Sequence, residues 1–168
     1  MAAISAQDSG DARKALDLLR ISADIAERNG DKKVLEAHVD YARKKVEIDA
    51  SAEIVRSLTL QSKLVLVAII KSTNNGNEQT ITGDVYTMYH SFANKMGVQP
   101  LTQRRIGDLI SELDMLGIIN ARIRSLGKKG RTKIISLNIP KDIVNIVLND
   151  EVLKTLNLTK LSTQQTLD

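Results

Sequence analysis

The side chains most able to do chemistry in this sequence are cations, and they are concentrated in one segment. Residues 95–141 hold ten lysines and arginines against three carboxylates, a local charge of +7. The whole chain carries only +4, so the remaining residues sum to −3. Such an asymmetry favours a surface that binds a polyanion over a charge spread for general solubility.

Two groups of residues in this segment are candidates for contacting nucleic acid. The first opens a predicted helix, where Arg and Gln can reach base edges bidentately and Thr or Ser can bond a phosphate. The second forms a predicted hairpin with no acidic residue and a glycine-flanked turn that lets the backbone approach DNA closely. The candidates on the helix are Thr102, Gln103, Arg104, Arg105 and Ser111. Those on the hairpin are Arg122, Arg124, Lys128, Lys129, Gly130, Arg131 and Lys133.

Each group also has a plainer interpretation. The helix can be an ordinary amphipathic helix with a solvated basic start, and Asp108 on its exposed face limits how closely it approaches phosphates. Charge runs on protein surfaces are usually just solvated. The length of the acid-free run and its place beside a recognition-type helix favour the nucleic-acid interpretation.

Hydrophobic spacing predicts the elements that hold these candidates. Apolar residues recur at i, i+3, i+4, i+7 and i+10 from Ile106, which predicts a helix over residues 102–116 that stops at Gly117. Two β-branched stretches, 118–126 and 132–139, predict the hairpin. Upstream, the pattern predicts a buried helix through residues 62–70, a turn at 74–77, an extended piece at 79–82 and a helix from 83 or 84 to 95. Downstream of Pro140 it predicts a helix over 141–148.

Three helices followed by a two-stranded hairpin with a basic tip are typical of a winged helix, an elaborated helix-turn-helix. We assign this domain to residues 58–168. Residues 1–57 are predicted to form two helices, one from about residue 10 to 28 with Asp11 as its N-cap and Gly30 at its end, and one from Glu36 towards residue 56. The second places Val39, Ala42 and Val46 on one face. The fold class is therefore mainly α with a small β-hairpin.

Composition and spacing exclude several other function classes. Without cysteine there is no disulfide, thiolate zinc site or cysteine nucleophile, and four aromatics are too few for a module that stacks unpaired bases. The two histidines, His38 and His90, stand 52 positions apart without metal-type spacing, and are better explained as surface or boundary residues. We expect no catalytic residue, no metal site and no membrane contact, in a cytoplasmic, nucleoid-associated protein.

The stretch from Gly10 to Arg20, Gly-Asp-Ala-Arg-Lys-Ala-Leu-Asp-Leu-Leu-Arg, resembles the sensor-2 helix of archaeal replication initiators of the AAA+ class. These are relatives of the origin recognition complex large subunit and cell division control protein 6. The similarity continues through the helix at 63–70, the stretch at 113–121 and Gly-Arg-Thr-Lys at 130–133. It implies the end of an AAA+ lid domain followed by a winged-helix domain that binds replication origins.

The resemblance also implies partners and a cofactor. The family helps to load the replicative minichromosome maintenance helicase and acts with other initiator subunits. Its sensor-2 arginine, matched by Arg13, reaches ATP held with magnesium by the core ATPase domain. This sequence has no Gly-x-x-x-x-Gly-Lys-Ser/Thr loop, so we expect no cofactor in this fragment and an idle Arg13. A truncated chain and a natural short protein both remain open.

Two alternatives belong to other classes. The winged helix can be a protein-docking module, with a predicted exposed apolar face formed by Val144, Ile146, Val147, Leu153 and Leu156. It can also be a stand-alone transcription regulator, which needs a dimerisation helix.

Overall fold

The computed structural model describes residues 2–73, 78–125 and 131–156, with side chains from residue 12 onward. These residues form two compact units that divide after residue 50. The boundary expected at residue 57 falls at the end of helix α2 (Glu36–Ser57), which begins in the first unit and ends in the second.

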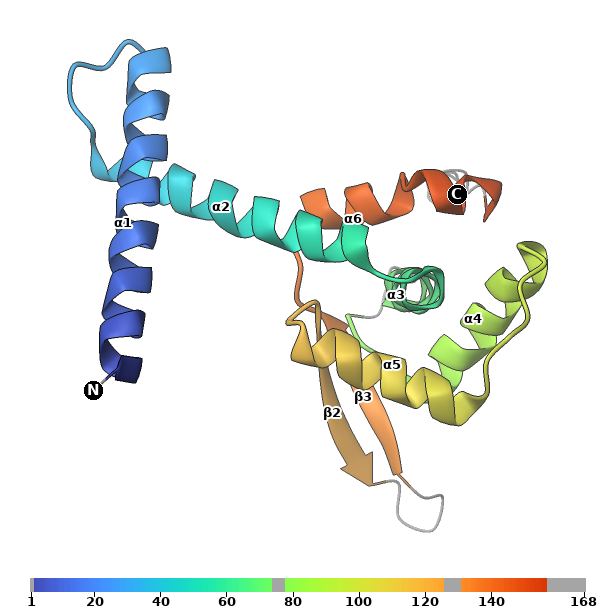
Figure 1. The fold of residues 1–168 in the computed structure, drawn as a ribbon. Coiled ribbons are helices and arrows are strands. Elements are labelled where there is room, and N and C mark those ends of the chain that lie inside the picture. The colour runs from blue at the N-terminus through green and yellow to red at the C-terminus, as the bar shows by residue number, and fades with distance from the viewer. Residues whose placement is uncertain (1, 74–77, 126–130, 157–168) are drawn as a thin grey trace. The chain divides into compact units, whose positions relative to one another are not determined.

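The first unit contains helix α1 (Ala2–Arg28) and the start of α2 (Figure 1). The predicted start of α1 near residue 10 was wrong. The helix already begins at Ala2, so Asp11 lies inside it and is not its cap. Gly10 suggested a break, but one glycine costs a helix interior only about 1 kcal/mol, too little to end it.

Helix α1 ends as predicted at Arg28, and Gly30 forms the turn just beyond it. The φ of Gly30, 79°, is left-handed, and the N–H groups of Gly30 and Asp31 bond back to the carbonyls of Glu27 and Ala26 at 3.0 and 2.9 Å. This pattern is a Schellman motif, which satisfies the last carbonyls of a helix.

The large apolar side chains of α1 stay mostly uncovered within the first unit. Ala26 is buried, but Leu16 and Leu19 are 66% and 57% exposed. On α2, Ala42 is buried, Val39 is half-buried and Val46 is exposed. Two helices alone bury little apolar surface.

The second unit is built around helix α3 (Leu60–Thr73). Its residues 62–70 are all buried, which confirms the predicted buried helix. Figure 1 shows α3 nearly end-on, with helices α4 (Thr82–Lys95), α5 (Gln103–Met115) and α6 (Lys141–Leu148) arranged around it. A helix that is hydrophobic all round must be covered on every side, and these neighbours cover it.

A three-stranded antiparallel sheet completes this unit. Strands β2 (Ile119–Ser125) and β3 (Arg131–Leu137) form the predicted hairpin, and β1 (Thr80–Ile81) pairs with the other edge of β3 to give the order β1-β3-β2. The sequence predicted the extended piece at 79–82 but not its pairing. The fold class, mainly helical with a small sheet, is confirmed.

A buried tyrosine joins three parts of this unit. The hydroxyl of Tyr89, on α4, donates to Gln61 Oε1 of α3 at 2.6 Å and accepts the N–H of Leu101 at 3.0 Å. Leu101 stands just before α5, so this one side chain fixes the turn between the two helices of the helix-turn-helix. Both hydrogen-bonding capacities of the buried hydroxyl are used.

The apolar face predicted to be exposed near the C-terminal end was wrong. Val147, Leu153 and Leu156 are buried, and Val144 and Ile146 are half-buried. The cause is a 3₁₀ helix, η2 (Glu151–Leu156), which spacing from 144 to 156 did not predict. Asp150 starts it by accepting the N–H of Val152 on Oδ1 at 2.9 Å.

Asp150 also forms an ion pair with Lys63 of α3, with Nζ and Oδ2 2.6 Å apart and both side chains at most 14% exposed. Burial raises the pKa of the Asp150 carboxyl, but the hydrogen bonds from Lys63 and Val152 and the charge of Lys63 outweigh it, so the pKa lies below its ordinary value. The pair fastens the C-terminal elements to α3.

None of the helices in the described part of the chain combines the length and the hydrophobicity that a membrane-spanning segment needs.

Replacing Asp150 with Ala should lower the free energy of unfolding by about 3 kcal/mol, because it leaves Lys63 buried without its partner. Glu151→Ala, which removes the exposed pair with Lys154, is the matched control and should cost less than about 1 kcal/mol.

The pKa of Asp150 is lowered on folding, which makes the effect of its replacement depend on pH. Its contribution is therefore complete above the unfolded pKa, about 3.9, and is lost as pH falls through the folded value. Urea unfolding of wild type and variant from pH 7 to pH 2 should show the difference shrinking only below about pH 4; a constant difference would contradict this account.

Candidate nucleic-acid interface

The N-terminus of α5 is set by Thr102, the first predicted contact residue. Thr102 is the N-cap, and its hydroxyl oxygen accepts the N–H of Arg105 at 3.3 Å. The cap uses the acceptor side of this hydroxyl and leaves its hydrogen available to donate to a phosphate.

Arg104 and Arg105 lie in different places on α5. The buried stripe of this helix is Ile106, Leu109, Ile110 and Leu113. At about 100° per residue, Arg104 lies nearly opposite that stripe, whereas Arg105 lies on its flank. The guanidinium of Arg105 approaches Asp108 and Glu112 at 3.8 and 3.6 Å. Among the described residues, Arg104 has no ion-pair partner.

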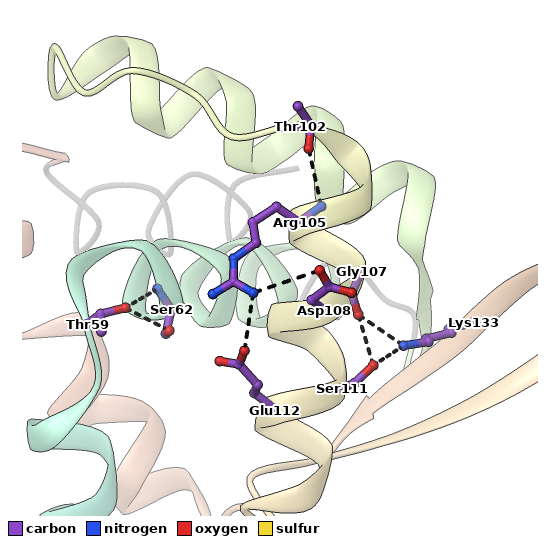
Figure 2. Close-up of polar contacts among 9 residues, drawn as sticks. All are labelled: Thr59, Ser62, Thr102, Arg105, Gly107, Asp108, Ser111, Glu112 and Lys133. Carbon is purple, nitrogen blue, oxygen red and sulfur yellow. Dashed lines mark hydrogen bonds and ion pairs between the residues drawn. The ribbon is translucent and has the colours of Figure 1, made fainter.

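A row of small and polar residues runs along the side of α5 that faces the hairpin. Gln103, Gly107 and Ser111 stand four residues apart, which places them one above another on a helix. Figure 2 shows Gly107 and Ser111 on the side of α5 nearer Lys133, with Arg105 on the other side. Ser111 is thus placed towards the hairpin.

A hollow of about 460 Å³ lies between α5, the start of α4 and the hairpin. Its lining consists of Ile81, Thr82, Gly83, Gln103, Gly107, Ile123, Arg131, Thr132 and Lys133. Added side chains would have room at the two glycines, since a Cβ on Gly83 or Gly107 would meet no atom within 4 Å. The hollow joins the two regions that the sequence predicted to contact nucleic acid.

The cations of the hairpin lie on both of its faces. Paired residues in antiparallel strands share a face, and alternate residues point to opposite faces. Lys133 pairs with Ile123 and Arg131 with Ser125, on the face towards α5. Arg122 and Arg124 pair with Ile134 and Thr132, on the other face. Lys128, Lys129 and Gly130, the predicted hairpin tip, lie outside the described residues.

Lys133 is engaged with α5. Its ammonium group donates to the carbonyl of Gly107 at 3.1 Å and to the hydroxyl of Ser111 (Figure 2). The Ser111 hydroxyl in turn donates to the same carbonyl at 3.0 Å. The sequence predicted both residues as contacts for DNA, whereas the structure brings them together within the protein.

Sequence reasoning missed Gly107 and Ile123, which line the hollow; Ile123 is 70% exposed on the α5-facing side of the hairpin. The four-residue spacing from Gln103 and the strand alternation from Arg122 could have located them. Neither residue carries a charge, so the distribution of cations along the sequence does not mark them.

Arg13 and His38 do not line the hollow. Arg13 is exposed, and because α1 begins at Ala2 it stands about three turns inside the helix rather than at its N-terminus. His38 is buried and bonded on both ring nitrogens, to the N–H of Leu35 and to Asp31, each at 3.1 Å. Within the described ranges, no cluster of histidine and carboxylate side chains could hold a metal ion.

Two models of known protein families match this chain. Residues 53–146 match the family described as CDC6, C terminal winged helix domain, and residues 1–44 match the Cdc6 AAA+ ATPase-type lid domain. The chain belongs to the Cdc6 family. Both parts of the Cdc6 match occur in the predicted order, lid before winged helix.

Archaeal ORC1-type proteins are among the similar relatives. The chain is 48% identical over 167 residues to the ORC1-type DNA replication protein of Thermococcus onnurineus, covering 99% of this chain and 40% of that protein. It is 51% identical over 158 residues to ORC1-type DNA replication protein 1 of Methanosarcina mazei, covering 92% and 38%. The chain thus spans about two fifths of the length of these relatives.

Solved structures of the family agree. The Aeropyrum pernix ORC1 protein, solved in complex with DNA, matches with a TM-score of 0.78 and 40% identity over 92% of this chain and 41% of that one. Drosophila ORC bound to DNA matches with a TM-score of 0.55 and 28% identity over 84% and 36%.

Proposed function

We propose that this chain binds double-stranded DNA at replication origins, as the lid and winged-helix portion of an archaeal initiator. The observation that carries the proposal is the likeness to Aeropyrum pernix ORC1, whose structure is a complex with DNA. The exposed cations of α5 and of the hairpin supply the charge that a DNA ligand needs.

In the proposed complex, α5 lies in the major groove and the hairpin lies against the neighbouring minor groove or backbone. Arg104 reads a base edge, because it stands opposite the buried stripe, and Gln103 and the Thr102 hydroxyl contact bases or phosphates. Arg122, Arg124 and Arg131 neutralise phosphates, together with Lys128 and Lys129. The hollow between α5 and the hairpin receives the sugar-phosphate strand that separates the two grooves.

The whole initiator is proposed to act with partners outside this chain. It would help to load the replicative helicase in concert with other initiator subunits. Arg13 would meet ATP and magnesium only where an ATPase core holds them; its exposed position leaves it free to do so. The exposed leucines of α1 support this proposal, since a covering domain would remove them from water.

The alternative function, protein docking, required an exposed apolar face over residues 144–156, which the described residues there do not form. Three of the five residues proposed for it are buried, and the other two are half-buried. Family membership also favours an initiator over a stand-alone transcription regulator.

The test of this function is binding of the 168-residue chain to origin and scrambled duplexes across a salt series. If four to six phosphates are neutralised, log K should fall with log salt at a slope of about −4 to −5. Fluorescence anisotropy at 50 to 300 mM salt measures it. No binding at low salt, or a salt-independent affinity, would contradict the proposal.

Arg104 and Arg105 should differ as determinants of sequence preference. Arg104→Gln should weaken binding to the origin duplex about tenfold and relax its preference over scrambled DNA, because a base contact is lost. Arg105→Gln, the neighbouring control, should change either affinity less than threefold because Arg105 approaches Asp108 and Glu112. Competition binding distinguishes them, and a larger effect at Arg105 would reverse the assignment.

Gly107 gives a test of the hollow. Gly107→Ala should stabilise the fold by about 1 kcal/mol through helix propensity, since the added methyl meets no atom. It should nonetheless weaken duplex binding severalfold, because the methyl projects where the strand passes. Gly10→Ala in α1 is the control and should leave binding unchanged. A Gly107→Ala chain that binds as tightly as wild type would show that the strand does not enter the hollow.

A further inference from the structure

Lys133 is the point where three elements of the winged helix meet. Its ammonium group bonds the Gly107 carbonyl and the Ser111 hydroxyl of α5, as described above. Its backbone N–H donates to Oγ1 of Thr82, the first residue of α4, at 3.3 Å. We call the group formed by Lys133, Ser111 and the Gly107 carbonyl the wing clasp.

The wing clasp is the side-chain contact that ties this part of the hairpin to α5, whereas the Thr82 bond and the β1 pairing tie β3 to the start of α4 and to β1. The base of the hairpin is held by Asp114, which accepts the N–H of Ala121 at 2.9 Å, and by Asn138, whose side chain donates to the Gly117 carbonyl at 2.9 Å. Lys133 lies further out. It pairs with Ile123, two residue pairs before the described ladder ends at Ser125 and Arg131. Beyond the β1 pairing at Ile134 the described ladder has only two strands, which are marginally stable alone, so a contact at Lys133 supports it.

The groups in the wing clasp are already committed to each other. The Ser111 hydroxyl donates to one acceptor and accepts from Lys133, which leaves it little capacity for DNA. Two of the three ammonium hydrogens of Lys133 are used within the protein. Both residues are only half-exposed, unlike Arg122 and Arg124 on the opposite face.

We propose that Lys133 and Ser111 are positioning residues that fix the hairpin relative to α5, so that helix and hairpin meet DNA as one preorganised surface. The proposal rests on the proposed duplex binding. A loosened hairpin must be ordered when it binds, and that entropy is subtracted from the affinity. The alternative role for Lys133 is a direct phosphate contact, which releases counterions and therefore contributes to the salt dependence.

The experiment compares Ser111→Ala, Lys133→Met, the double variant and the conservative Ser111→Thr with wild type. Arg122→Met is the matched control, since it removes a cation from the opposite face of the same hairpin. Duplex affinity is measured across the salt series at a temperature where every variant is folded. Hydrogen exchange of the β3 amides is measured on the same chains without DNA.

The positioning role gives a distinctive pattern. Ser111→Ala and Lys133→Met should each weaken binding about tenfold, the size of one charge-assisted hydrogen bond. The double variant should be no weaker than Lys133→Met, because Lys133→Met already removes both bonds of the ammonium group to α5. Their salt slopes should match wild type, and Ser111→Thr should bind normally because it keeps the hydroxyl. Arg122→Met should reduce the slope by about one.

Other outcomes overturn the proposal. A slope reduced by about one in Lys133→Met, with no effect of Ser111→Ala, would make Lys133 a phosphate contact. Loss of thermal stability with unchanged affinity would reduce the wing clasp to a purely structural role. Failure of wild type to bind any duplex would contradict the proposed function instead. In that case, β3 amides that exchange equally fast in wild type and Ser111→Ala would overturn the positioning role independently.

Discussion

The burial of helix α3 is the constraint on which the winged-helix unit depends. Nine consecutive residues of this helix are buried, so every side of it must be covered by something else. The hydrophobic effect has no directional preference of its own. Direction comes from the polar contacts at the rim, where Tyr89 fixes the turn before α5 and Lys63 fastens Asp150. The exposed side of α5 is a consequence of where its apolar stripe must lie.

Local signals explain what the sequence predicted well. Gly30, Gly97 and Gly117 each have a positive φ and each end a helix with the same pair of backward bonds, so three helix ends could be placed from glycine alone. The stripe from Ile106 to Leu113 likewise fixed α5. The prediction of where α1 starts was wrong because no apolar periodicity marks residues 2–9.

The features that were missed depend on contacts between distant residues. The pairing of β1 with β3 joins positions about fifty apart, and the ion pair that ties Asp150 to Lys63 of α3 spans 87 positions. The same limit applies to the candidate site. Charge could be counted along the chain, but Arg105, Lys133 and Arg104 are chemically alike in sequence and differ only in what surrounds them. Of these three, Arg105 and Lys133 have partners within the fold, so counting charge along the chain does not show which cations face a ligand.

The hairpin and α5 together form an asymmetric surface for binding DNA. Helix and hairpin differ in shape and chemistry, and they stand on opposite sides of one hollow. A surface of this kind has no internal twofold axis. A single copy bound as proposed would therefore have a front and a back along the duplex, and the element it recognises would have a direction rather than the mirrored halves that symmetric dimers require.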